Sequence, residues 1–131
     1  MNKELETAFV KNFIKKQYQE RLLFELNSPK KREDFIWRFC HRTEVIVNPQ
    51  RIILKGTKIA KEDLDNEIKQ IKGDVYVLSL DYPEGQMMNV QEALAYFEDE
   101  YMPVIIMFAD NLAFIKTEVE YGAPEKYLLG K

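Results

Sequence analysis

The chain of 131 residues contains one cysteine, one histidine and only two serines. A single cysteine excludes a disulfide within the chain, and a single histidine beside it excludes a zinc site of nitrogen and sulfur ligands from one chain. Cys40 and His41 are neighbours, which on a helix point about 100° apart and so cannot act together as nucleophile and base. Ser28 suits a helix cap and Ser79 lies in an apolar run. These scarcities argue against thiol, serine or zinc hydrolases and indicate no cofactor or metal.

Long hydrophobic runs are also missing. The longest, residues 102–109, is far shorter than the roughly 20 residues that span a bilayer. The first residues, Met1–Glu6, mix acids and bases where a secretory signal has a basic and then an apolar stretch. A lone cysteine is typical of a reducing compartment. We therefore expect a cytoplasmic protein with no membrane segment.

Charge is distributed unevenly along the chain. Residues 1–58 carry 13 Lys and Arg against 7 Asp and Glu, whereas residues 59–131 carry 6 against 15. The two parts therefore have net charges of +6 and −9 within an overall charge of −3. Fields of opposite sign on one small protein steer encounters with charged partners. The length and the hydrophobic content of 46% predict a single α/β domain over residues 1–131.

Residues 1–43 are predicted to form a pair of helices. The range 3–26 has neither glycine nor proline, and apolar residues recur along it at helical spacing, at Leu5, Phe9, Val10, Phe13 and Ile14. We expect one long helix that bends or whose halves face different neighbours. Ser28 and Pro29 suit the start of a second helix, in which Phe35, Ile36 and Phe39 form the buried face.

Residues 51–119 are predicted to form the core, in the order strand, helix, strand, helix, strand, strand. Asn89, with Glu92 three residues later, resembles a capping box before the second of these helices. Helices between strands favour crossover connections, and the nearly continuous apolar run 75–80 is typical of a strand covered on both faces. We therefore predict a mixed, largely parallel sheet of about four or five strands, with 112–119 as an antiparallel edge strand and the last dozen residues adding a short strand or docking.

A basic cluster is the first candidate site. Lys30, Lys31 and Arg32 are expected in the first turn of the second helix, where positive charge opposes the helix dipole. With Arg38 and Arg42 further along, they could receive a phosphate or an acidic partner. The alternative is a solvated turn whose charges pair with acids of the same chain. Nucleic acid is an unlikely partner, because the chain is acidic overall and no DNA- or RNA-binding motif accompanies the cluster.

An acidic cluster is the second candidate. Glu98, Asp99 and Glu100 are expected at the end of the helix that begins after Asn89, where the dipole favours cations. Acids at this position are as misplaced as the bases at residues 30–32. Both clusters therefore suggest a surface that meets a charged partner.

Two loops offer a different kind of site. Ligands of open α/β sheets bind beyond the carboxyl ends of the strands, where this chain places Lys55, Thr57 and Lys58 after one strand and Asp81 and Glu84 after the next. The first loop could hold a phosphate, although it lacks the P-loop spacing, and the second could hold a metal or act in acid/base chemistry. Turns are rich in Asp, Pro and Gly for backbone reasons alone, so this is the weaker hypothesis.

The function expected from these patterns is macromolecular binding rather than catalysis. Small, acidic bacterial immunity and antitoxin proteins have this general character, an analogy of class rather than of motif. The partner is expected to be another protein, and a homodimer is possible. The alternative is a phosphate-ligand or nucleotide binder or enzyme that uses the two loops. Glutamine at positions 30–32 is expected to hold or raise stability and to weaken binding of an acidic partner.

Overall fold

The computed structural model describes residues 2–81, 83–96, 102–117 and 124–131. Its helices are α1 (Lys3–Phe13), α2 (Lys16–Asn27), α3 (Arg32–His41), α4 (Thr43–Ile46), α5 (Lys61–Ile68) and α6 (Val90–Tyr96), with a 3₁₀ turn at Pro49–Arg51. The strands are β1 (Ile52–Gly56), β2 (Asp74–Ser79), β3 (Met87–Asn89), β4 (Val104–Ala109), β5 (Leu112–Lys116) and β6 (Lys126–Gly130). The strands form one sheet in the order β1-β6-β5-β4-β2-β3.

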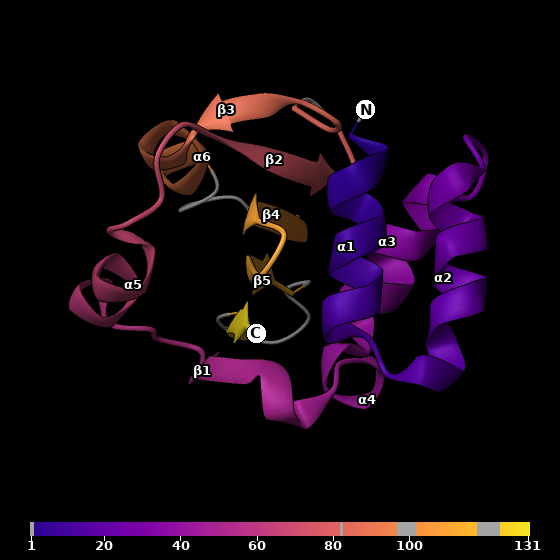
Figure 1. The fold of residues 1–131 in the computed structure, drawn as a ribbon, viewed down its shortest axis with the longest axis horizontal. Helices are drawn as coiled ribbons and strands as arrows, with labels where there is room; N and C mark the ends of the chain where they lie inside the picture. Colours follow the sequence, from indigo (N-terminus) through magenta and orange to yellow (C-terminus); the bar gives the residue numbers. More distant parts are fainter. Residues whose placement is uncertain (1, 82, 97–101, 118–123) are drawn as a thin grey trace.

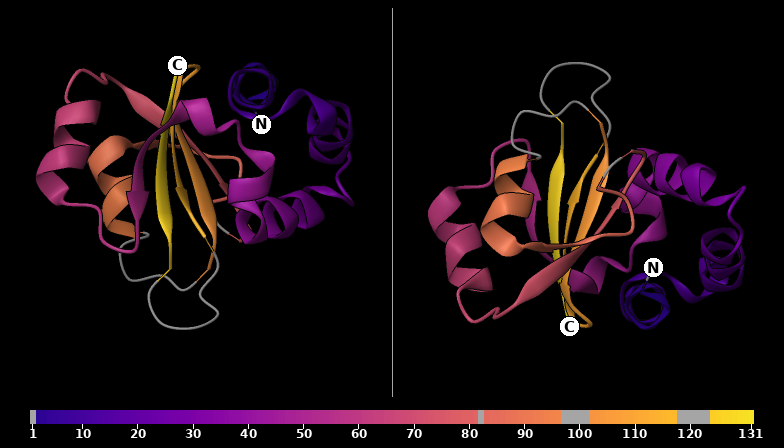
Figure 2. Two further views of the ribbon diagram at one scale, coloured as in Figure 1. Left: turned by 90° about the horizontal axis from the view of Figure 1, so that it is seen from below. Right: turned by 90° about the horizontal axis from the view of Figure 1, so that it is seen from above.

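Helices cover both faces of this sheet. Helices α1 and α3 lie against one face, and α5 and α6 lie over the other (Figure 1). Helix α2 packs on α1 and α3, on the side away from the sheet (Figure 2). In β4, Ile105 and Met107 point toward the amino-terminal helices, whereas Val104, Ile106 and Phe108 point toward α5 and α6. The strands read as continuous apolar runs because each side chain enters one of two cores.

The prediction of a largely parallel sheet of four or five strands is wrong, because the described residues form six strands and all neighbouring strands among them are antiparallel. The cause is the short strand β3, which turns the chain back beside β2 before α6 begins. Helix α6 therefore connects β3 to β4, which lie on either side of β2. Strands β1 and β2 do run in the same direction, but β6, β5 and β4 lie between them.

The expected edge strand is also in a different place. Strand β5 is antiparallel to β4, as predicted, but β6 pairs with its other side and makes it internal. The last residues thus add a strand, one of the two alternatives left open by the sequence. Tyr127 and Leu129 enter the core beneath α1 and α3, and Leu128 enters the opposite core.

The predicted long first helix is two helices. It breaks at Ile14, which has extended backbone angles and forms an isolated antiparallel bridge with Val47. Backbone hydrogen bonds from Lys15 to Ile46 and from Asn48 to Phe13 hold this bridge. A long-range contact therefore ends the helix where no glycine or proline does.

The helix predicted to begin near Pro29 starts at Arg32, so Lys30 and Lys31 precede it. Its first turn carries Glu33 and Asp34, which suit the dipole. In the ranges that the structure describes, there is no helix with the length and apolar character needed to cross a membrane.

Candidate functional site

Arg32 is the centre of a buried polar network and does not face solvent. Its guanidinium donates two hydrogen bonds of 2.9 Å to the carboxylate of Glu6 on α1, and a third, of 3.0 Å, to Glu84 after β2. A further bond of 2.9 Å goes to the carbonyl of Leu26 at the end of α2. Arg32 and Glu6 are 7% and 2% exposed, so this ion pair lies inside the protein.

Tyr76 completes the network from the sheet. Its hydroxyl donates a hydrogen bond of 2.5 Å to Glu6. Burial, followed by the bond to Glu6, raises the pKa of Tyr76 to about 12. Burial alone lowers the pKa of Arg32, but the hydrogen bonds and charges of Glu6 and Glu84 raise it above its ordinary value. The network thus joins α1, α3 and β2, and near neutral pH Arg32 is charged and Tyr76 keeps its proton.

The rest of the predicted basic cluster is divided. Arg38 is half-buried and pairs with Glu25, so it joins α3 to α2. Lys31 makes only a loose pair with Asp34, with Nζ and Oδ2 4.0 Å apart. Lys30 and Arg42 are exposed, and neither has an ion pair within the described ranges. Of the five predicted cations, three therefore remain available at the surface: Lys30, Lys31 and Arg42. Glu98, Asp99 and Glu100 lie outside the described residues.

The two predicted ligand loops do not meet. Gly56 and Ser79 lie on one row across the sheet, with β6, β5 and β4 between their strands. Four strand spacings separate the two by roughly 19 Å. Lys55 instead forms ion pairs with Glu44 and Glu125, and Thr57 and Lys58 are exposed.

The second loop has a structural use. Glu84 binds Arg32, and Asp81 accepts a hydrogen bond from Ser79 through its backbone carbonyl. The structure therefore does not bring the two loops together around one site. Over the four described ranges, no group of three or more His, Cys, Asp or Glu side chains could hold a metal ion.

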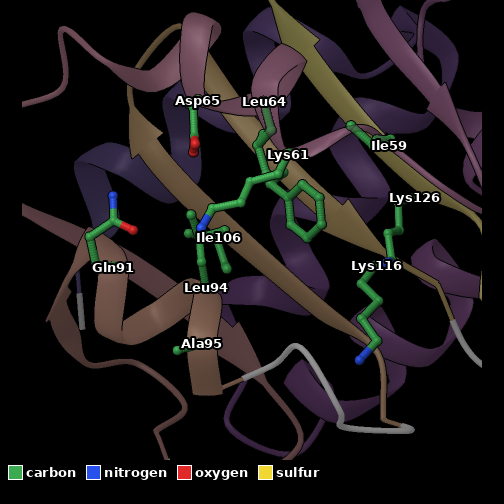
Figure 3. Close-up of a pocket in the computed structure, with 11 residues that line it drawn as sticks. Ile59, Lys61, Leu64, Asp65, Gln91, Leu94, Ala95, Ile106, Lys116 and Lys126 are labelled. Atoms are coloured by element: carbon green, nitrogen blue, oxygen red, sulfur yellow. The ribbon is translucent and has the colours of Figure 1, made fainter.

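A pocket of about 250 Å³ opens between α5 and α6, over β4, β5 and β6. We call it the α5–α6 pocket. Its apolar lining comes from the loop after β1, both helices and the sheet: Ile59, Leu64, Leu94, Ala95, Ile106 and Phe114. Its polar lining consists of Lys61, Asp65, Gln91, Lys116 and Lys126. Figure 3 shows Lys61 extending from α5 over Ile106, with Lys116 and Lys126 on the opposite side of the pocket.

Strand register explains why two lysines meet here. Lys116 on β5 and Lys126 on β6 are direct cross-strand partners. Lys116 lies two residues from Phe114, and Lys126 lies two residues from Leu128. Phe114 and Leu128 belong to the core under α5 and α6, so both lysines are on that face of the sheet. Lys116 is 2% exposed, and it is engaged in an interaction within the protein. A lysine pair is thus built into the sheet wall of the pocket, beside its apolar lining.

Sequence reasoning missed Glu6 and the three pocket lysines. Two of them carry a signal. Glu6 lies three residues before Phe9 and seven before Phe13, on the buried face of α1. This spacing predicts that the Glu6 carboxylate lies inside the protein. Lys116 ends the apolar run of β5 on its buried face. Lys61 and Lys126 have no comparable signal, because only the fold brings them together.

Comparison of the chain with protein-family models, with curated proteins and with solved structures finds no significant match.

Proposed function

We propose that the protein binds a small organic ligand in the α5–α6 pocket. The observation that carries the proposal is the lining: six apolar side chains surround the space and five polar side chains border it. Ligand sites in proteins have this composition, with an apolar wall and a few placed polar groups that fix orientation. Two helices and three strands supply the wall, so the pocket rests on the regular elements of the fold.

The size of the pocket limits the ligand. A cavity of about 150 Å³ holds benzene, so about 250 Å³ accommodates one ring or a short chain together with a polar group. This volume is below the usual range for nucleotides and drug-sized molecules, about 300–1,000 Å³. The proposed ligand of this pocket is therefore smaller than a nucleotide.

A blocked variant tests the proposal. Ala95 lines the pocket on α6 and is exposed, so Ala95→Trp fills the opening without disturbing the core. Glu92→Trp is the matched control, because Glu92 is exposed on the same helix and does not line the pocket. In a screen of small organic fragments by saturation-transfer NMR, wild type and Glu92→Trp are expected to give hits that Ala95→Trp loses. Hits that persist in Ala95→Trp, or a screen without hits, would contradict the proposal.

A second candidate is binding of an acidic protein through the exposed cations before and after α3. Lys30, Lys31 and Arg42 support it, since the described residues provide only one loose ion pair for the three. Replacing all three by glutamine leaves Arg32 and the core intact. An acidic partner bound by wild type at low salt is expected to be lost in this variant, and equal binding by both proteins would contradict it.

The compartment is likewise a proposal. We place the protein in the cytosol because the sequence has a single cysteine, Cys40, which cannot form a disulfide within the chain. Fractionation of the native cell, followed by detection of the chain, tests this location.

A further inference from the structure

We infer that the ligand of the α5–α6 pocket is an amphiphilic organic anion, a compact apolar body with one anionic head group. This inference rests on the proposed function, because it names the chemistry of a ligand bound in that pocket. The reason is the charge of the lining, in which Lys61, Lys116 and Lys126 stand against one carboxylate, Asp65, among the described residues. Lys116 is already engaged within the protein, so Lys61 and Lys126 against Asp65 leave this part of the lining with a net charge of +1.

The charges of Lys61 and Lys126 are not neutralised by an ion pair within the described part of the pocket. Neither Lys61 nor Lys126 forms an ion pair with any residue in the described parts of the chain. Asp65 lies one helical turn after Lys61 on α5, but no ion pair joins them, and a lysine that precedes the acid is the less favourable order on a helix. Figure 3 shows the Lys61 side chain extending over Ile106, on the same side of the pocket as Asp65.

The two strand lysines favour an anion for a second reason. Like charges directly opposite each other on neighbouring strands destabilise a sheet. Lys116 and Lys126 are such a pair. Because Lys116 already has an interaction within the protein, the inference depends on Lys126 and Lys61, and an anionic head group near them would reduce the remaining repulsion.

The apolar lining excludes a simple inorganic anion as the intended ligand. Leu64, Leu94 and Ile106 come from three different elements and face one space. A bare anion would lose water against these side chains and could not gain from burying them. An apolar body buries them instead, and low local polarity strengthens the attraction between the head group and the lysines.

The test compares an acid with its neutral counterpart. Hexanoate and hexanamide have nearly the same size and differ in charge, and acetate has the charge without the apolar body. In isothermal titration calorimetry, we expect hexanoate to bind about tenfold more tightly than either hexanamide or acetate. Raising the salt concentration is expected to weaken hexanoate binding and to leave hexanamide unchanged.

Variants of opposite sign sharpen the comparison. Lys126→Met is expected to weaken hexanoate binding about three- to tenfold, and Asp65→Asn to strengthen it by a similar factor, with hexanamide affected by neither. Lys69→Met is the control, because it removes an exposed lysine next to α5 that does not line the pocket. Lys116 is left unchanged because it is buried.

The outcomes separate this inference from the proposed function. Equal affinity for hexanoate and hexanamide, both abolished by Ala95→Trp, would overturn the anion and leave the pocket as a ligand site. Binding of neither compound, in a protein that gives no fragment hits, would overturn both. An equal loss of hexanoate affinity in Lys126→Met and Lys69→Met would also overturn the inference. The net charge of the protein surface, and not the lysines of the pocket, would then attract the anion.

Discussion

Removing Arg32 is predicted to destabilise the protein strongly, although its sequence position resembles an exposed basic turn. Arg32→Met deletes three hydrogen bonds to Glu6 and Glu84 and one to the carbonyl of Leu26. Glu6, which is 2% exposed, would retain the Tyr76 hydroxyl as its close partner. Breaking a buried ion pair by removing one partner costs about 3–5 kcal/mol.

The loss is large relative to the whole stability of a domain, about 5–15 kcal/mol. Unfolding entropy near 2.1 cal/mol/K per residue, applied to 131 residues, converts it to a fall in Tm of about 11–18 °C. Circular dichroism with thermal and urea unfolding measures both quantities. Lys31→Met is the control. Lys31 is exposed, and its replacement is expected to change stability by no more than about 0.5 kcal/mol.

A double variant separates a buried charge from lost packing. Glu6→Gln combined with Arg32→Met removes both charges, and is expected to be at least about 1 kcal/mol more stable than Arg32→Met alone. A loss below about 1 kcal/mol for Arg32→Met, or no recovery in the double variant, would refute the buried network. The structure thus argues against the expectation that glutamine at position 32 preserves stability.

Three further predictions concern other parts of the molecule. Burial raises the pKa of Tyr76 and of Tyr127 to about 12, helped by the bond to Glu6 at Tyr76 and by the charge of Glu125 at Tyr127. Between about pH 10 and 12 both tyrosines therefore keep their protons in the folded protein, whereas the unfolded chain has lost them. The free energy of unfolding should fall over this pH range by about 2–3 kcal/mol per tyrosine. Tyr76→Phe should show a smaller fall in urea titrations over that window, and an unchanged fall would count against the burial of the hydroxyl. Asn89 caps α6 by accepting from the backbone of the two residues after Val90, so Asn89→Ala should cost about 1 kcal/mol in denaturant unfolding and a loss near zero would contradict the cap. The Lys55 ion pairs are exposed, so Lys55→Met should cost at most about 1 kcal/mol and leave ligand binding unchanged.

Local signals in the sequence predict individual elements well. Asn89 lies at the start of α6 as its capping pattern indicates, and the strand predicted over residues 75–80 corresponds to β2. Two features that set the topology are harder to predict from the sequence. Met87 to Asn89 are too few residues to show a period, yet they reverse the chain and make the sheet antiparallel. Ile14 ends α1 through a bridge with Val47, a contact 33 residues away that no local preference encodes.

Candidate sites follow the same division. The charges at residues 30–32 were grouped by position along the chain, but only the fold shows that Arg32 points inward to Glu6 while Lys30 stays exposed. The α5–α6 pocket combines Lys61 with Lys126, which are 65 residues apart in the sequence. Its existence depends on the strand order, and the predicted parallel sheet placed the ligand elsewhere.

The most direct measurement of the central claim is a titration of the ¹⁵N-labelled protein with hexanoate, followed by ¹H–¹⁵N correlation spectra. The account predicts saturable shifts at the backbone amides of the pocket, above all in α5, α6, β5 and β6, with α1, α2 and α3 unaffected. Shifts concentrated around Lys30, Lys31 and Arg42, or no saturable shift anywhere, would contradict it.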